Sequence, residues 1–285
     1  MNTKDKQEII KYIGSLKPSL AGKFFYYCLP FRKNVILKNM NIVFHDVLSQ
    51  TQIKKLALAF YSHIATSLKE NLMMRFWNED KIKSKAQVQG SEYVKQVLDL
   101  NKGALVLTGH FGNWEFAPIA GILNFKLLQG HFYFIRKLIG NKWLEKKLFS
   151  RYYNAGLNVI PKKHSLTKVC QVLENNSAVV FVMDQHACIK SKDGIKANFF
   201  NKPAGTYRSL ATIARNMEVP VIPAQSYRKK DGTHVLEFYP PLEWIDAEKS
   251  RDQLSKNTQY YNQVLEGMIL KYPEQWLWMH KRWKI

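Results

Sequence analysis

The feature that most constrains the fold of this chain is a change of pattern near Val88. Downstream of that point, short apolar runs alternate with segments whose apolar residues follow helical spacing. This alternation is typical of α/β proteins, so we expect a mixed, largely parallel sheet flanked by helices. The predicted strands are residues 104–108, 132–136, 157–161, 178–183, 219–225 and 235–239, and the predicted helices are residues 114–124, 142–153, 165–174, 207–216 and a final segment around 260–269.

The chain upstream of this core is predicted to be helical over about residues 8–77. The pattern is clearest where Ile53, Leu56, Phe60, Ile64 and Leu68 recur at three- and four-residue steps. No internal repeat and no Gly/Ser-rich linker interrupts the chain. We therefore expect a helical N-terminal region, residues 1–85, packed on one α/β core of residues 86–285.

The charge balance predicts an anionic partner. The chain has 43 Lys and Arg against 22 Asp and Glu, a formal net charge of +21, which suits nucleic acid, an anionic membrane surface or an acidic carrier protein. The basic residues are spread along the chain, and no zinc-finger, RNP or basic-zipper signature is present. We therefore expect no nucleic-acid partner, and DNA binding is the competing hypothesis from a different class.

A membrane contact is predicted at the surface of a bilayer rather than across it. No run of about 18 uncharged apolar residues is present, and the first residues lack the apolar segment of a signal peptide. Residues 24–31, FFYYCLPF, are flanked by basic side chains and either cap the core or lie in the membrane plane with snorkelling cations. The last ten residues, WLWMHKRWKI, allow the same two interpretations. The three widely spaced cysteines favour a reducing, cytosolic compartment.

The segment that carries chemistry is GALVLTGHFGNWEFAPIAG, a strand, a turn and a helix that include His110 and Glu115. In α/β folds, sites form at strand ends. Residues five apart on a continuous helix are turned about 140° from each other, but with His110 in the turn and Glu115 on the first helical turn the carboxylate can reach the imidazole. A His held by a carboxylate is the base half of a catalytic triad. We therefore predict that His110 and Glu115 are the catalytic pair.

No protein nucleophile accompanies this pair. The sequence has no G-x-S-x-G elbow, and no Ser or Cys adjoins the turn, which argues against a covalent acyl-enzyme. The pattern favours direct attack by a substrate hydroxyl, deprotonated by His110, on an activated acyl carbonyl. We expect no cofactor and no metal, since His186 and Cys188 stand two residues apart without a second pair of ligands.

The motif HFGNWE resembles the His-x4-acid motif of glycerolipid acyltransferases, and in particular that of the lipid A late acyltransferases, which add secondary acyl chains to lipopolysaccharide precursors. Further matches follow in the order expected for that family and cover about residues 100–285: FIR at 134–136, VIPK at 159–162, MDQ at 183–185, FFNKPA at 199–204, VPVIP at 219–223 and YPEQWLW at 272–278. Members of this family commonly begin with a membrane-spanning helix. This sequence departs from them there, so the implied attachment is peripheral, with about 1 kcal/mol from each Lys or Arg near an anionic surface.

The resemblance also implies roles for individual residues. It makes His110 the general base with Glu115 as its partner, and it makes Arg136 a group that binds phosphate or steadies the donor carbonyl. Asp184 and Gln185 end an apolar strand and should lie at the sheet edge that holds His110, as substrate contacts or as loop anchors. The predicted substrate-binding residues are Arg136, Asn113, Asp184, Gln185 and Arg208, the last of which could face a lipid phosphate.

The activity implied by the resemblance is transfer of a fatty acyl chain from acyl-ACP to a hydroxyl of a lipid A precursor of the Kdo2-lipid A type, at the cytoplasmic face of the bacterial inner membrane. The Lys-rich stretch 190–196, predicted to be a solvated loop, could contact the acidic acyl carrier protein. One alternative keeps the chemistry and changes the acceptor to a lysophospholipid, an aminolipid or a glycolipid. Another is a non-catalytic lipid-binding relative, which the intact His and Glu disfavour.

Overall fold

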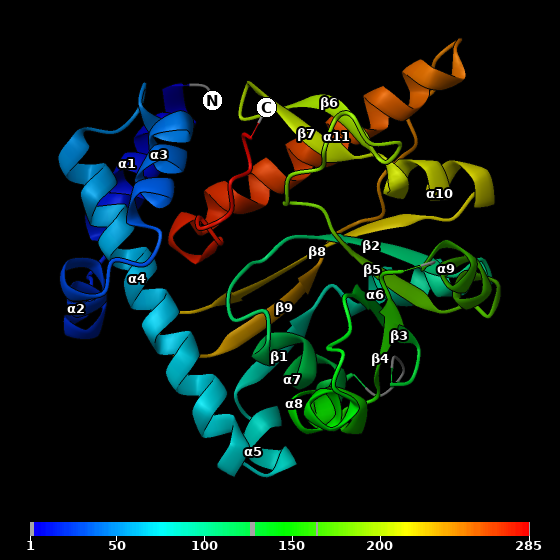
Figure 1. The fold of residues 1–285 in the computed structure, drawn as a ribbon, viewed down its shortest axis with the longest axis horizontal. Coiled ribbons are helices and arrows are strands. Elements are labelled where there is room, and N and C mark those ends of the chain that lie inside the picture. The colour runs from blue at the N-terminus through cyan, green and yellow to red at the C-terminus, as the bar shows by residue number, and fades with distance from the viewer. Residues whose placement is uncertain (1–2, 126–128, 164, 285) are drawn as a thin grey trace.

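The structure, a computed structural model, describes residues 3–125, 129–163 and 165–284. The two predicted regions, 1–85 and 86–285, also contain residues 1, 2, 126–128, 164 and 285, which lie outside the described residues. A seven-stranded sheet with strand order β1-β9-β8-β2-β5-β3-β4 runs through the molecule (Figure 1). Its strands are β1 (Ala86–Gln89), β2 (Ala104–Thr108), β3 (Phe132–Arg136), β4 (Leu157–Pro161), β5 (Ala178–Val182), β8 (Val221–Arg228) and β9 (His234–Phe238).

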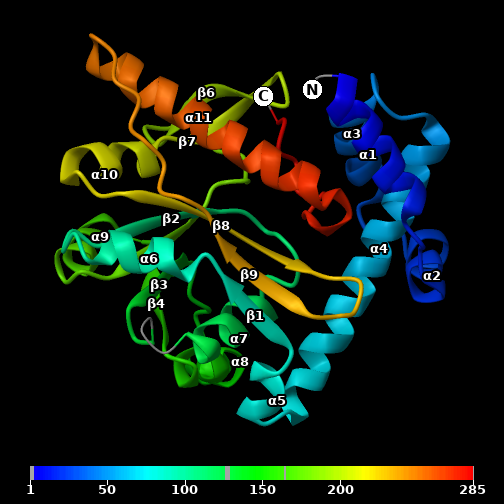
Figure 2. The ribbon, with the colours of Figure 1, turned by 180° about the vertical axis from the view of Figure 1, so that it is seen from behind.

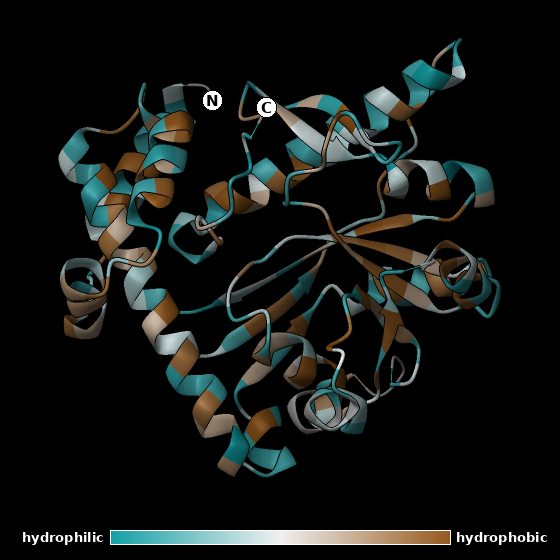
Figure 3. Cartoon of the chain, viewed as in Figure 1, coloured by the Kyte–Doolittle hydropathy of each residue, from teal (hydrophilic) through white to brown (hydrophobic). Residues whose placement is uncertain are grey.

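The sheet is mixed and largely parallel, as predicted. Every neighbouring pair of its strands is parallel except β8 and β9. The central strand β2 is apolar from Ala104 to Leu107 because helices cover both of its faces. Leu105 and Leu107 pack into one core and Ala104 and Val106 into the other, and the apolar colour of the central strands is visible in Figure 3.

Helices form a layer on each side of this sheet (Figures 1 and 2). α6 (Ser91–Leu98) and α7 (Phe116–Asn124) contribute apolar residues to the core on one face. α9 (Ser165–Glu174), α10 (Ser209–Met217) and α11 (Ser250–Lys271) contribute to the core on the other face. α8 (Lys142–Asn154) packs against β4, and a 3₁₀ turn, η3 (Pro273–Gln275), follows α11.

Three strands were not predicted from the sequence. One is the edge strand β1, and the other two, β6 (Gly194–Phe199) and β7 (Lys202–Tyr207), form a separate antiparallel hairpin. The predicted loop 190–196 therefore runs into β6, and the helix predicted to begin at Tyr207 begins at Ser209. The sequence did not predict the hairpin because Lys196 and Asn198 leave one face of β6 exposed and polar, and because β7 contains Pro and Gly.

The helical pattern predicted for residues 8–77 is confirmed. The helices are α1 (Thr3–Ser15), α2 (Leu20–Cys28), α3 (Lys33–Phe44), α4 (Gln50–Met73), the short η1 (Met74–Phe76) and α5 (Glu79–Lys83). α2 packs so closely on α4 that only glycine fits at position 22: a Cβ there would lie 2.6 Å from the Cα of Ser62. Within the described residues, no helix combines the length and the apolar character needed to cross a membrane.

Candidate active site

The candidate site forms where β2 and β5 end side by side. Thr108 of β2 lies opposite Val182 of β5, so the residues that follow the two strands share one edge of the sheet. His110 and Asp184 each follow their strand by two residues. The turn after His110 requires glycine at Gly112, whose φ is 55° and whose Cβ would lie 2.7 Å from a backbone oxygen.

His110 and Asp184 are joined by two hydrogen bonds. The His110 backbone N–H donates to Asp184 Oδ2 over 2.8 Å, and His110 Nδ1 lies 2.9 Å from Asp184 Oδ1. Because a carboxylate only accepts, Nδ1 carries a proton and Nε2 is the acceptor of the neutral ring. Trp276 Nε1 donates to the same Oδ2 over 2.8 Å. Asp184 thus fixes both the tautomer and the orientation of the imidazole.

The two groups tune each other's protonation. Burial alone would raise the pKa of Asp184, but the neighbouring His110 and the hydrogen bonds that the carboxylate accepts lower it to about 2. Burial alone would lower the pKa of His110, but the Asp184 carboxylate, with a smaller effect from Glu115, raises this pKa above its usual value. The site is therefore suited to stabilise the imidazolium that forms when His110 accepts a proton.

The predicted contact between His110 and Glu115 is wrong. Glu115 Oε2 accepts a hydrogen bond from the Tyr152 hydroxyl over 2.7 Å, and among the described residues no hydrogen bond joins Glu115 to His110. The side chain of Glu115, the residue before α7, is held by α8 instead. Its charge still acts on the pKa of His110. The catalytic role of Glu115 stays a prediction.

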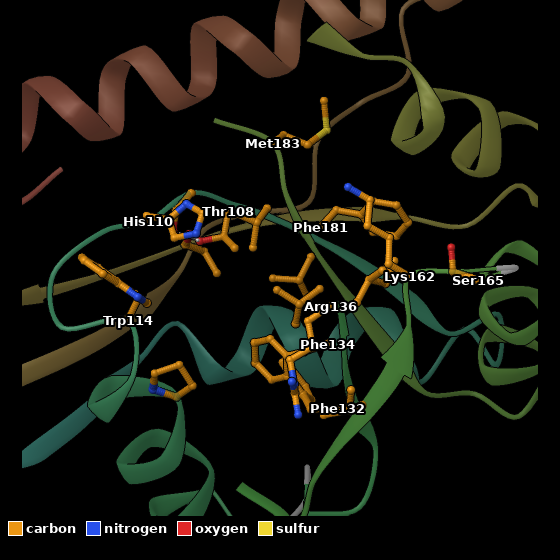
Figure 4. A pocket seen from close by; sticks show the side chains of 18 of the residues that line it. Thr108, His110, Trp114, Phe132, Phe134, Arg136, Lys162, Ser165, Phe181 and Met183 are labelled. Atoms are coloured by element: carbon orange, nitrogen blue, oxygen red, sulfur yellow. Dashed lines mark hydrogen bonds between the residues drawn. The ribbon is translucent and has the colours of Figure 1, made fainter. Parts of the chain in front are cut away.

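A cavity of about 670 Å³ lies beside His110 (Figure 4). Its volume falls in the range of small-molecule sites. Its polar lining includes His110, Glu115, Arg136 and Gln185. A long alkyl chain with a reactive carbon at one end fits such a space. Most of the cavity wall is apolar, with side chains from the sheet and its flanking helices that include Val106, Phe132, Phe134, Phe149, Val180, Phe181, Met183, Ile213 and Phe238.

Arg136 and Gln185 line this cavity together with His110, as their strand-end positions predict. The Arg136 guanidinium forms an ion pair with Glu145 and lies 3.4 Å from the centroid of the Phe149 ring. Its Nε atom is buried with no hydrogen-bond partner among the described residues. Gln185 Nε2 lies 3.4 Å from His110 Nε2. Both side chains can therefore present donors to a carbonyl or phosphate bound in the cavity.

The other three predicted substrate-binding residues, Asp184, Asn113 and Arg208, do not line this cavity. Asp184 is 1% exposed and holds His110 instead, as described above. Asn113 is 2% exposed; its amide donates to Glu70 Oε2 over 2.9 Å, and its Oδ1 accepts from the Phe116 N–H at the start of α7. The expected substrate contact of Asn113 is thus replaced by a structural one, because both ends of its side chain are used within the fold. Arg208 is exposed just before α10, and its contact with a lipid phosphate stays a prediction.

The C-terminal residues supply two neighbours of the site that were not predicted. Besides Trp276, His280 lies with its ring centroid 5.3 Å from that of His110 and its Nε2 3.5 Å from Gln185 Nε2. Burial, followed by the nearby charge of His110, lowers the pKa of His280. Trp276 and Trp278 are buried, so this part of the tail closes the core and the site rather than contacting a membrane. Trp276 belongs to the YPEQWLW match, and both Trp276 and His280 belong to the tail considered above, but no pattern in the sequence placed either of them at the site.

Helix α4 supports the turn of His110 from the side of the N-terminal region. Glu70 accepts hydrogen bonds from Asn113 and from Arg228, whose Nε lies 2.9 Å from Glu70 Oε1. Two turns earlier on α4, His63 Nε2 lies 3.0 Å from the Gly112 carbonyl oxygen. The N-terminal region therefore helps to set the position of the turn that holds His110.

This chain is similar to known lipid A biosynthesis acyltransferases over most of its length. A family model described as bacterial lipid A biosynthesis acyltransferase matches residues 18–285. The lipid A biosynthesis palmitoleoyltransferase of Escherichia coli (strain K12) is 22% identical over 277 residues, 97% of this chain and 85% of that protein. The lipid A biosynthesis lauroyltransferase of the same organism is 23% identical over 92% of this chain and 82% of its own length. The crystal structure of the 1-acyl-sn-glycerophosphate acyltransferase PlsC from Thermotoga maritima is 16% identical, with a TM-score of 0.39 over 89% of this chain and 96% of that one.

Proposed function

Because this chain belongs to the family of bacterial lipid A biosynthesis acyltransferases, we propose that it moves a fatty acyl chain from acyl-ACP to a hydroxyl of a lipid A precursor, with His110 as the general base. The observation that carries the proposal is the hydrogen-bonded pair of His110 and Asp184 beside a largely apolar cavity. The pair supplies a base with a fixed tautomer. The cavity supplies room for an acyl chain.

The reaction needs one proton acceptor and two substrates. His110 Nε2 takes the proton of the acceptor hydroxyl while the hydroxyl oxygen attacks the carbonyl carbon of the thioester. The carbon–sulfur bond then breaks, and the leaving thiolate receives the proton from His110. Asp184 stays ionised throughout and stabilises the transient imidazolium. Gln185 or Arg136 would donate to the carbonyl oxygen, where negative charge develops.

Acyl-ACP is the proposed donor because a carrier protein of acidic character suits the basic surface beside the cavity. The segment that leads into β6 carries the exposed Lys190 and Lys192, and Lys196 is exposed on β6 itself. Asp193, the last residue before β6, lines the cavity. Lys162 lines the cavity as well. A carrier protein bound there would place its acyl chain near the opening of the cavity, with its acidic surface next to these lysines.

The proposal is tested by incubating the purified protein with acyl-ACP or acyl-CoA and a panel of acceptors, with products identified by mass spectrometry. We expect a new ester on Kdo2-lipid IVA with acyl-ACP as the better donor. The His110→Ala variant controls for contaminating activity. Transfer to a lysophospholipid, an aminolipid or another glycolipid alone would replace the acceptor, and absence of transfer to any acceptor by the folded protein would overturn the proposal.

The proposal includes peripheral attachment to an anionic membrane through the α2 surface, which we define as the exposed apolar side chains of α2 and the loop after it. This surface lies beside Lys17, Lys23 and Arg32, so apolar insertion and attraction to anionic lipid act together. The cytoplasmic face of the inner membrane is the proposed location. The members of the α2 surface are Leu20, Phe24, Tyr27, Leu29 and Phe31.

Substituting Phe24 and Phe31 of the α2 surface with Glu is expected to weaken binding to anionic vesicles about 10²-fold. Each exposed Phe can gain roughly 1.5–3 kcal/mol on burial in the bilayer interface, and 1.4 kcal/mol corresponds to a tenfold change. Sedimentation with vesicles that contain phosphatidylglycerol measures the effect. Leu100→Glu is the matched control, because Leu100 is equally exposed but lies outside this surface. Equal loss in the control, or no loss in the double variant, would contradict the assignment.

A further inference from the structure

A second, smaller cavity lies on the other side of the Glu115–Tyr152 hydrogen bond. It has a volume of about 340 Å³, and Glu115 and Tyr152 line it as well as the first cavity. The remaining wall comes from the end of α4, from η1 and from α7 and α8. Its two positive groups are Arg75 and Arg151, and Asn71 is its other polar residue. The mechanism described above uses none of these three side chains.

The two arginines of this second cavity have no acidic partner at salt-bridge distance in the described part of the chain. Arg151 donates to the Met74 carbonyl oxygen, and Arg75 is exposed without a hydrogen-bonded side-chain partner there. Both side chains line the same cavity, and burial, followed by the like charge of Arg75, lowers the pKa of Arg151. The one carboxylate on this wall, Glu115, already accepts the Tyr152 hydroxyl. Two guanidinium groups that line one cavity favour a bound anion, and phosphate above all.

A third polar group of the cavity, the side-chain oxygen of Asn71, lacks a hydrogen-bond donor among the described residues. Asn71 Oδ1 is buried and accepts no hydrogen bond among the described residues. An unsatisfied buried acceptor is costly, so a ligand that donates a hydroxyl would be favoured there. Phosphate oxygens for the arginines and a hydroxyl for Asn71 together describe a phosphorylated sugar or another phosphate ester with a free hydroxyl.

The surface next to the second cavity is apolar. Leu72 and Met73 of α4 and Phe76 of η1 are exposed, the last at 82%, and they alternate in sequence with the cavity residues Asn71, Met74 and Arg75. A head group in the cavity would therefore have apolar side chains available for its own acyl chains. This neighbourhood suits an amphiphile better than a soluble metabolite.

From these contacts we infer that the second cavity is a phosphate-ester subsite, in which Arg75 and Arg151 hold the phosphate and Asn71 a hydroxyl while the reacting group lies near His110. The inference rests on the proposed function and deepens it. The same chemistry occurs in two substrates: the sugar phosphate of the lipid acceptor and the phosphodiester of the donor's pantetheine arm. The exposed apolar side chains of α4 and η1 favour the acceptor.

The test compares wild type with Arg75→Ala, Arg75→Lys and Arg251→Ala, the last being an exposed arginine on α11. With the bisphosphorylated precursor as acceptor, we expect Arg75→Ala to raise the acceptor KM roughly tenfold to 10²-fold, as for a lost charged hydrogen bond. Lys at position 75 should restore part of this loss. Arg251→Ala should leave both KM values within twofold of wild type. With an acceptor that lacks phosphate, the difference between wild type and Arg75→Ala should disappear.

The outcomes separate this inference from the proposed function. A rise in the donor KM alone would support the subsite and assign it to the pantetheine phosphate. If wild type transfers acyl chains and Arg75→Ala keeps the wild-type KM for both substrates, the subsite is overturned. If wild type transfers to no acceptor, binding of glucosamine 1-phosphate, followed by saturation-transfer NMR, decides the question: binding at least tenfold weaker in Arg75→Ala than in Arg251→Ala supports the subsite, and equal binding or none refutes it.

Discussion

Replacing Asp184 with Asn is expected to lower kcat for acyl transfer by about 10⁴-fold, the loss seen when a catalytic carboxylate becomes an amide and the His tautomer changes. In wild type, Oδ1 and Oδ2 accept three hydrogen bonds, two from His110 and one from Trp276. An amide can accept on one side only. Its NH₂ group would face His110 Nδ1 and move the ring proton to Nε2, the atom that must accept the proton of the substrate. Steady-state kinetics, with near-UV circular dichroism to verify the fold, measure the loss.

Glu115→Gln is the comparison that separates direct contact from action through space. The carboxylate does not touch His110 and contributes only part of the rise in its pKa, so we expect a smaller loss of kcat than in Asp184→Asn. A raised pKa means that His110 becomes a neutral base only at higher pH, so the rate rises with pH through that pKa. Removing the Glu115 charge lowers the pKa, and the acid limb of the rate profile should move to lower pH. An equal loss in both variants with an unmoved acid limb would contradict this division of roles.

The sequence predicted the core of the fold because its central strands are buried on both faces. The runs of β2 and β5 are short and largely apolar, and their predicted bounds agree with the structure to within one residue. The edge strand β1, AQVQ, is half polar, so its pattern does not distinguish it from a loop. β1 exists because β9 offers it a parallel partner, in which Ala86 lies opposite His234. Such pairing joins residues about 150 positions apart and leaves no local signal.

The site was predicted in part, for the same physical reason. Local spacing located His110 in the turn after β2, and strand-end placement brought Asp184 and Gln185 to its edge. Spacing favoured Glu115 as the carboxylate partner because it weighs only neighbours in sequence. The actual partner stands 74 residues away and comes into reach through the register of β2 and β5. Trp276, whose indole N–H donates the third hydrogen bond to Asp184, comes from a tail whose position depends on packing across the entire core.

Helix α4 makes the N-terminal region part of this site through Glu70. Oε1 of Glu70 accepts from Arg228 Nε over 2.9 Å and lies 3.2 Å from His234 Nε2, while Oε2 accepts from Asn113. Burial would raise the pKa of Glu70, but the hydrogen bonds and charges of His234 and Arg228 lower it to about 2. The carboxylate is thus ionised in the folded protein. Its contribution to stability is complete above pH 4.5, its ordinary pKa, and is lost as the pH falls towards 2.

Glu70→Gln is therefore expected to lower the free energy of unfolding by about 3 kcal/mol at pH 7, because it leaves the mostly buried Arg228 guanidinium without its counter-charge. We expect kcat to fall as well, by up to about 10²-fold, since Asn113 and the turn of His110 lose their support. Urea denaturation gives the first quantity. Glu79→Gln is the matched control: Glu79 pairs with Lys83 on the surface, and loss of such a pair costs less than about 1 kcal/mol. The double variant Glu70→Gln, Arg228→Gln should recover part of the lost stability, because the unpaired charge is gone; a simple sum of the two single losses would show that Glu70 acts through packing and not through its charge.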